Sequence, residues 1–287
     1  MQIPKIAIYL FATGLLCLFI LLPISLLVPS LLIYALLILG FSIVLLMQIL
    51  IYRRIRKYAR LEQADLIDRI SHANRERERE YAQIEALFSV FSVIQPAHPL
   101  PSMRGWAISP DFAILLISLL DQYQPQLVLE AGSGVSTIII GHRLKTLDQG
   151  QLISLDHEAE FSQKSQSNIH RHGLQSVARV IYSPLTNFEI QGKQWLWYDT
   201  TELSHNLHGT IDFLVIDGPP YFIQDLSRYP ALPILFDMLS DDAIILMDDA
   251  DRDAEKKIIE LWKNEFKFSS VNKVHAEKGA CILYLKK

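Results

Sequence analysis

Cysteine is scarce in this chain, with two in 287 residues. Cys17 lies inside a long apolar segment and Cys281 lies in a late apolar stretch. Small secreted domains held together by disulfides carry more cysteines, at regular spacings. The scarcity therefore excludes the disulfide-rich secreted class and agrees with a reducing compartment.

An excess of positive charge is also lacking. Lysine and arginine number 27 against 31 aspartates and glutamates, which gives a formal net charge of −4. Domains that bind DNA or RNA usually carry a basic patch or stripe. We therefore expect no nucleic-acid partner.

Formal charge is absent altogether from residues 6–52. The run divides at Pro29 into two segments, and each is long enough to span a hydrocarbon core of about 30 Å. A cleaved signal peptide is the alternative, but the run is too long for one, only Lys5 precedes it, and no small-residue cleavage site ends it. Residues 1–52 therefore predict a transmembrane hairpin that lies in the membrane through residues 6–52.

A basic cluster follows the apolar run directly, at Arg53, Arg54, Arg56 and Lys57. Basic residues beside a membrane span stay on the cytoplasmic side. We therefore expect the N-terminus and the rest of the chain in the cytoplasm, at the inner membrane if the organism is bacterial.

Residues 53–95 predict one long polar helix. Large apolar residues recur at 3-4-3 spacing near its end, at Tyr81, Ile84, Phe88 and Phe91. This pattern suits either a short coiled coil that forms a homodimer or a juxtamembrane helix whose last turns dock on the next domain. We favour the juxtamembrane helix because the heptad pattern is short.

A proline-rich stretch ends this helix, with prolines at 96, 99, 101 and 110. We therefore predict a separate domain over residues 96–287. Expected strands cover 127–130, 151–156, 178–182, 212–217, 243–248, 267–274 and 279–285, and expected helices cover 135–147, 158–172, 226–239 and 253–266. Alternating strands and helices predict a parallel sheet covered on both faces, and two final strands so close in sequence must be antiparallel. The fold class is α/β, a Rossmann-like doubly wound, mostly parallel seven-stranded sheet with a C-terminal antiparallel hairpin.

The sequence LVLEAGSGVST at 127–137 joins an apolar strand to a glycine-rich turn and a helix start. This arrangement holds nucleotide-like ligands, because glycines let the ligand approach the backbone. A third glycine is missing, since Thr137 stands where a dinucleotide fingerprint requires it. The absence argues against an NAD-dependent enzyme, and Glu130 suits a ligand with a cationic amino group.

These features together resemble the class I S-adenosylmethionine-dependent methyltransferases, over roughly residues 105–287. The O-methyltransferase branch, which includes catechol O-methyltransferase, has an acid after the fourth strand and an acidic pair after the fifth. Asp217, Asp248 and Asp249 stand at these places.

The resemblance implies S-adenosylmethionine as cofactor. Glu130 and the glycine turn would lie against its methionine end, and Asp156 would accept hydrogen bonds from the ribose hydroxyls. The implied cofactor-binding set is Glu130, Gly132, Ser133, Gly134, Ser136, Thr137, Asp156, His157, Ser183 and Asp217. Two structural alternatives stay open: Asp156 as a helix N-cap and Glu130 as a salt-bridge partner at the strand end.

The resemblance also places Asp217, Asp248 and Asp249 at one edge of the sheet, where they would repel one another unless a cation or protons intervene. Mg²⁺ suits such oxygen ligands, and the three aspartates are its predicted ligands. The alternative is that Asp248 or Asp249 caps the following turn. The lysine base of that branch is missing after Asp217, so the base would be Asp217, Asp249 or a histidine. The predicted catalytic residues are Asp217 and Asp249.

Two nearby groups have open roles. Arg228 and Tyr229, after the fourth strand, would contact substrate or serve a structural role, and Arg252 would neutralise the neighbouring acidic pair. Trp195, Trp197 and Tyr198 would form a substrate wall or pack in the interior, and packing is favoured.

We therefore predict a membrane-anchored S-adenosylmethionine-dependent methyltransferase. It would methylate an oxygen of a small or lipid-linked acceptor on the cytoplasmic side. The alternative is a catalytically degenerate methyltransferase fold that serves as an interaction module at the membrane.

Overall fold

The computed structural model describes residues 5–25, 29–207 and 209–287. The chain divides into two units, Met1–Arg77 and Glu78–Lys287.

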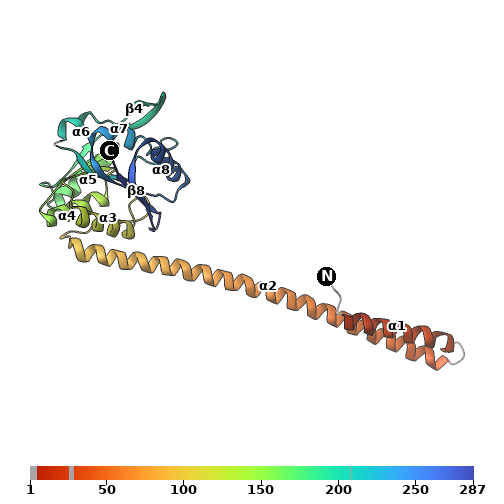
Figure 1. Cartoon of the computed structure of the whole chain (residues 1–287). Helices are drawn as coiled ribbons and strands as arrows, with labels where there is room; N and C mark the ends of the chain where they lie inside the picture. Colours follow the sequence, from red (N-terminus) through yellow and green to blue (C-terminus); the bar gives the residue numbers. More distant parts are fainter. Residues whose placement is uncertain (1–4, 26–28, 208) are drawn as a thin grey trace. The chain divides into compact units, whose positions relative to one another are not determined.

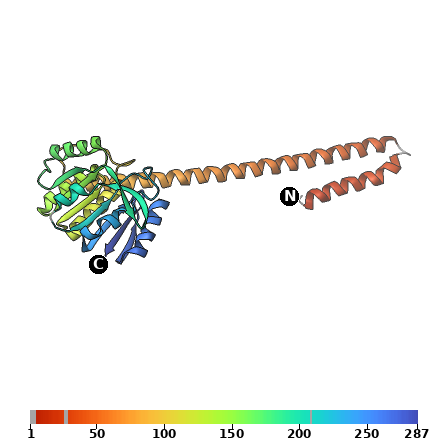
Figure 2. The ribbon, with the colours of Figure 1, turned by 90° about the horizontal axis from the view of Figure 1, so that it is seen from above.

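The first unit contains two helices, α1 (Lys5–Ser25) and the start of α2 (Pro29–Ile94). Figure 2 shows α1 folding back along α2, and Gly14 makes room for this contact, because a Cβ there would lie 2.9 Å from Ser42 Oγ. Among the described residues one helix, Leu32–Ile94, is long and apolar enough to cross a membrane, while the apolar part of α1 covers Phe11–Ile20. Residues 26–28 of the predicted hairpin turn lie outside the described residues. One of the two predicted spans therefore meets the length criterion.

The second unit is built on a seven-stranded sheet with the order β3-β2-β1-β6-β7-β9-β8. Its strands are β1 (Leu127–Ala131), β2 (Gln151–Asp156), β3 (Ala178–Tyr182), β6 (Ile211–Ile216), β7 (Leu239–Asp248), β8 (Phe268–Val274) and β9 (Ala280–Leu285). The pairs from β3 to β7 are parallel, and β9 pairs antiparallel with both β7 and β8. The predicted fold class is confirmed.

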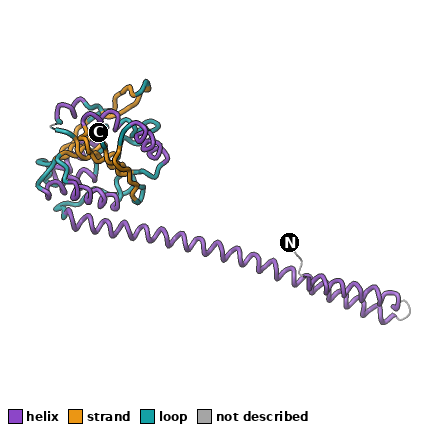
Figure 3. The backbone as a smooth tube through the Cα atoms, in the orientation of Figure 1, coloured by secondary structure: helices purple, strands orange, loops and turns teal. Residues whose placement is uncertain are grey.

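Helices cover both faces of this sheet (Figures 1 and 3). They are α3 (Pro110–Tyr123), α4 (Val135–Leu147), α5 (Ala159–Arg171), α6 (Thr201–Asn206), α7 (Ala231–Leu235) and α8 (Asp253–Glu265). Side chains of β1 alternate between the two hydrophobic layers. Val128 packs with α3 and α4, whereas Leu129 packs with α8. Helix α8 buries Ile258, Ile259 and Trp262, a spacing that puts them on one helical face.

Three differences from the sequence analysis have local causes. Helix α3 was not expected, although Ser109 and Pro110 are typical helix-start residues. The helix expected over 226–239 is reduced to α7 and a 3-10 turn, because Pro233 cannot donate within a helix and Leu239 already begins β7. The aromatic stretch forms a hairpin outside the main sheet, β4 (Leu185–Ile190) and β5 (Lys193–Tyr198).

The last turns of α2 belong to the second unit and pack within it, but not through the predicted apolar seam. Val90 and Ile94 are buried in the layer that contains α3, and Gln83 Nε2 donates to Asp111 Oδ2 at 2.7 Å. Tyr81, Ile84, Phe88 and Phe91 stay exposed, and the exposed fraction of Phe88 is 72%. The docking face is therefore the neighbouring face of the helix.

Candidate active site

A pocket of about 450 Å³ opens at the carboxyl ends of the parallel strands. Ligands of open α/β sheets bind at this edge, where the strand order reverses. Eight predicted site residues line it: Gly132, Ser133, Gly134, Ser136, Asp156, His157, Asp217 and Asp249. Four others do not line it: Glu130, Thr137, Ser183 and Asp248.

A buried chain of hydrogen bonds fixes the glycine turn between β1 and α4 on the side away from the pocket. Gly134 N donates to Thr137 Oγ1 at 3.0 Å, and Thr137 Oγ1 donates to Glu130 Oε2 at 2.7 Å. Ser154 Oγ donates to the same carboxylate oxygen, because the parallel register places Glu130 beside Ser154. Gly132 has a φ of 113°, which an L side chain rarely adopts. Glu130 thus supports the turn rather than the pocket wall.

Burial raises the pKa of Glu130 to about 7, although hydrogen bonds from Ser136, Ser154 and Thr137 oppose that shift. Its second oxygen, Oε1, is buried without a hydrogen-bond partner among the described residues. Neither oxygen forms an ion pair in the described part of the chain, so the salt-bridge alternative receives no support.

Asp156 ends β2 and stands in the pocket wall. Its Oδ1 accepts from Glu158 N at 3.0 Å, and its Oδ2 accepts from the hydroxyl of Ser133. The N-cap residue of α5 is Glu158, so Asp156 is not the helix cap that the structural alternative describes. Its side chain holds the backbone N–H of that cap residue and also lines the pocket. Ser183 is buried and donates its backbone N–H to Asp156 O at 2.7 Å.

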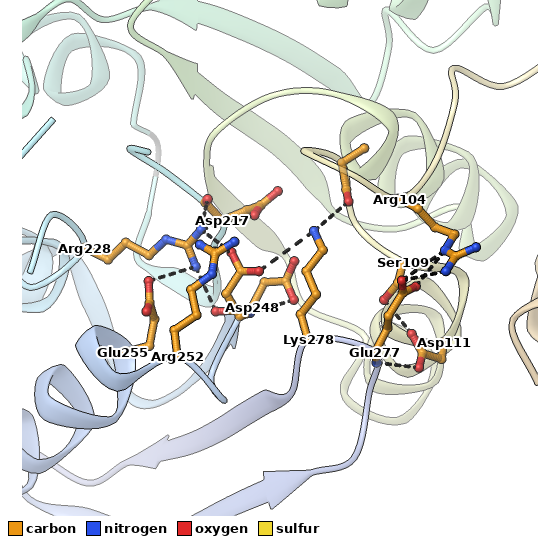
Figure 4. A network of polar contacts seen from close by, with 12 residues as sticks. Arg104, Ser109, Asp111, Asp217, Arg228, Asp248, Arg252, Glu255, Glu277 and Lys278 are labelled. Carbon is orange, nitrogen blue, oxygen red and sulfur yellow. Dashed lines mark hydrogen bonds and ion pairs between the residues drawn. The ribbon is translucent and has the colours of Figure 1, made fainter. Parts of the chain in front are cut away.

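Asp217, Asp248 and Asp249 gather at the ends of β6 and β7, with one carboxylate oxygen of each within 4.8 Å of the others (Figure 4). Asp248 Oδ1 accepts from Asp249 N at 2.8 Å, so Asp248 caps this turn. Burial raises the pKa of Asp248 to about 8, and the charges of Asp217 and Asp249 add to the shift. Burial also raises the pKa of Asp217, while Arg228 opposes that shift.

Arg228 lies among these acids and is 3% exposed. Its Nη2 is 2.7 Å from Asp249 Oδ2 and 3.6 Å from Asp217 Oδ1, and its Nη1 is 3.7 Å from Glu255 Oε1. It also donates to the backbone carbonyls of Asp217 and Asp248. Burial lowers its pKa, but the surrounding carboxylates outweigh this effect and raise it overall. Arg228 is thus the central cation of the cluster.

Two further cations, Arg252 and Lys278, lie beside the acids in Figure 4. Arg252 Nη1 lies 2.9 Å from Asp249 Oδ2. Lys278 Nζ lies 3.9 Å from Asp249 Oδ1 and donates to Ala107 O at 2.9 Å. Lys278 comes from the β8–β9 turn, about 30 residues after Asp249, so no local sequence motif predicts this contact.

The residues present do not fit a Mg²⁺ ion bound to all three aspartates. Asp249 Oδ2 already accepts a hydrogen bond from Arg228 and forms an ion pair with Arg252, and Arg228 lies against Asp217. Among the described residues, the buried oxygens of this trio without a hydrogen-bond partner are Asp248 Oδ2 and Asp249 Oδ1. Mg²⁺ requires a near-octahedral oxygen shell, and two carboxylate oxygens beside an ammonium group supply little of it.

Aromatic side chains form one rim of the pocket, which the sequence analysis missed. The rings of Trp106 and Tyr221 are stacked with centroids 6.2 Å apart, and Phe222 meets Trp106 edge-on at 5.9 Å. The Arg252 guanidinium lies 5.4 Å from the Tyr221 ring centre. By contrast, Trp195 and Trp197 are buried in the core, and packing was the favoured interpretation for both.

A strand order of 3-2-1-6-7-9-8, with helices on both faces and a ligand pocket above a glycine turn, defines the class I methyltransferase fold. Residues 129–250 match the sequence family described as a methyltransferase domain.

Solved structures agree on the fold. The Podospora anserina methyltransferase PaMTH1, solved with bound SAH, is 15% identical with a TM-score of 0.52, and the match covers 75% of this chain and 96% of that one. The O-methyltransferase from Bacillus cereus, in complex with SAH, is 18% identical with a TM-score of 0.52, covering 73% and 97%. A comparison with curated protein sequences found no match.

Proposed function

We propose that this chain is an S-adenosylmethionine-dependent O-methyltransferase anchored in a membrane. The observation that carries the proposal is the pocket above the glycine turn, with Asp156 on one side and Asp217 on the other. The two SAH-bound structures with this fold support the choice of cofactor. Bound S-adenosylmethionine would supply an electrophilic methyl group on its sulfonium sulfur.

The pocket residues have distinct roles in this proposal. Ser133, Gly134 and Ser136 surround the first turn of α4, whose free backbone N–H groups suit a carboxylate. Asp156 accepts the ribose hydroxyls and His157 borders the adenosine. Glu130 and Thr137 do not line the pocket; their hydrogen bond fixes the glycine turn that does. Ser183 fixes the end of β2 through its hydrogen bond to the backbone of Asp156.

Asp217 is the proposed proton acceptor for the acceptor hydroxyl. It lines the pocket, and its pKa is raised by burial. A carboxylate with a raised pKa takes a proton more readily than an ordinary one. Asp249 supports it indirectly by holding Arg228 in place. Arg228 and Arg252 then stabilise negative charge that develops on the acceptor oxygen.

The N-terminal part supplies the anchor in this proposal. Residues 1–52 form a transmembrane hairpin, residues 53–95 form a juxtamembrane helix, and residues 96–287 form the catalytic domain on the cytoplasmic side. Anchoring raises the local concentration of a lipid-linked acceptor, although a small soluble acceptor suits the pocket equally. We also propose that two copies associate through residues 53–95. This homodimer would cover the exposed apolar residues of α2.

Calorimetric titration of the detergent-solubilised full chain with S-adenosylmethionine and with SAH tests the cofactor. We expect micromolar binding that is lost in Asp156→Ala. The matched control is Asp242→Ala, an exposed aspartate of β7 outside the pocket. Absence of binding by the folded wild-type chain would contradict the proposal and favour the interaction module.

A further inference from the structure

We propose that Arg228 and Arg252, with Lys278 beside them, take the place of a divalent cation in the acidic cluster, so that the site neither binds nor requires Mg²⁺. The inference rests on contacts among side chains of this chain. It therefore stands whichever cofactor binds, and its test is separate from the titration with S-adenosylmethionine.

Arg228 lies between Asp217 and Asp249, the two acids of the cluster that line the pocket. Its Nη2 contacts carboxylate oxygens of both Asp249 and Asp217, at 2.7 and 3.6 Å, which is how a bridging ion would connect them. Its two backbone acceptors, Asp217 O and Asp248 O, fix the plane of the guanidinium. A planar fork held by four groups is preorganised, so it leaves little room for an ion to compete.

The charges of the cluster are nearly balanced without a metal. Four carboxylates, those of Asp217, Asp248, Asp249 and Glu255, surround three cations, those of Arg228, Arg252 and Lys278. The formal charge is 3 − 4 = −1 with all four acids ionised, and 3 − 3 = 0 when Asp248, whose pKa is raised to about 8, is protonated. A divalent ion would add two positive charges to a cluster that is already close to neutral. Separating Arg228 from Asp249 would also break an ion pair in which each side chain is 3% exposed, and breaking a buried ion pair is strongly unfavourable.

Arg252 gives the cluster a cation that faces the pocket. Its side chain is 38% exposed and lines the pocket, while its guanidinium contacts both Asp249 and the Tyr221 ring. A bound metal with open coordination positions would present positive charge to an acceptor oxygen in the same way. Arg228 thus connects the buried acids as a metal ion would, and Arg252 presents positive charge to the pocket as a metal ion would.

Mn²⁺ binding and thermal unfolding of the full chain test this inference. We expect no saturable Mn²⁺ binding by the wild type below millimolar concentration, by paramagnetic resonance of the free ion. We also expect no change in the melting temperature with Mg²⁺ or with EDTA. In Arg228→Met the melting temperature should fall by on the order of 10 °C. Mn²⁺ should then bind and restore part of the loss.

Arg252→Met keeps the inference testable if Arg228→Met does not fold, because Arg252 is partly exposed. It should also gain Mn²⁺ binding, more weakly. The matched control is Arg143→Met, which breaks the ion pair with Asp121 outside the pocket and should gain none. Micromolar Mn²⁺ binding by the wild type that is lost in Asp248→Asn would overturn the proposal. Failure of every folded arginine variant to gain binding would overturn it too.

Discussion

Glu130 illustrates at the residue scale how a buried acid supports the glycine turn without lining the pocket. The sequence analysis placed it against the amino group of the cofactor. In the structure it accepts hydrogen bonds from Thr137 and Ser154, and Thr137 in turn holds Gly134 N. The strand register decides this arrangement, because it brings Ser154 next to Glu130.

The charge state of Glu130 predicts a pH-dependent stability. Its pKa rises from an ordinary 4.5 to about 7 on folding. The folded state thus binds this proton more tightly, so the group stabilises the fold below pH 4.5 and loses that contribution as the pH rises through 7. Glu130→Gln stays neutral at every pH. Between pH 5 and pH 8 its stability relative to the wild type should rise by about 3 kcal/mol.

Denaturation followed by tryptophan fluorescence measures this effect in the full chain, because all four tryptophans lie in the second unit. Asp248 acts with the same sign but is present in both proteins, so it cancels in the comparison. Glu202→Gln, at an exposed position of α6, is the control. Parallel pH profiles for wild type and Glu130→Gln would show that the carboxyl keeps its ordinary pKa.

At the scale of elements, the end of α2 carries two apolar faces with different surroundings. Val90 is fully buried and Ile94 nearly so, whereas Phe88 is exposed. The sequence analysis identified the exposed face, because larger side chains gave it the clearer 3-4-3 spacing. Periodicity locates apolar faces, but only tertiary packing decides which one is covered.

A matched pair of substitutions separates the two faces. Val90→Asp places an unpaired charge among α3 residues and should lower the free energy of unfolding by about 3 kcal/mol. Phe88→Asp should change it by less than about 0.5 kcal/mol. Thermal unfolding followed by tryptophan fluorescence compares them. A large loss in Phe88→Asp, together with a fall in molecular mass from dimer to monomer, would instead show that a second copy covers this face.

At the scale of the whole molecule, the apolar N-terminal part predicts retention in a membrane. Leu37 lies in the apolar part of α2, and Leu61 lies beyond the basic cluster on the same helix. Leu37→Arg should weaken insertion by about 2.5–3.5 kcal/mol, because a charge near the middle of a span is costly. Leu61→Arg is the control and should change nothing.

Alkaline carbonate extraction of membranes followed by immunoblotting measures both variants. We expect the wild type and Leu61→Arg in the pellet and a measurable part of Leu37→Arg in the supernatant. Recovery of the wild type in the supernatant would contradict membrane anchoring.

Local chemistry determined much of this protein in advance. Apolar runs with glycine and proline boundaries predicted the parallel strands, and the short connection between the last two strands predicted their antiparallel pairing. Acids at strand ends were predicted to meet because the carboxyl ends of parallel strands share one edge, and Asp156, Asp217 and Asp249 all line the pocket. These features depend on near neighbours in the chain, so the sequence by itself carries them.

Tertiary structure alone decided what surrounds those acids. Lys278 from the β8–β9 turn, Arg228 from the segment after β6 and Arg252 at the start of α8 converge on Asp249. Trp106 and Tyr221 likewise stack on each other although they lie far apart in the sequence. No local pattern encodes such contacts, because each depends on where the sheet order and the loops bring distant side chains together. The physical nature of the site, an acidic cluster neutralised by its own cations, therefore follows from the fold.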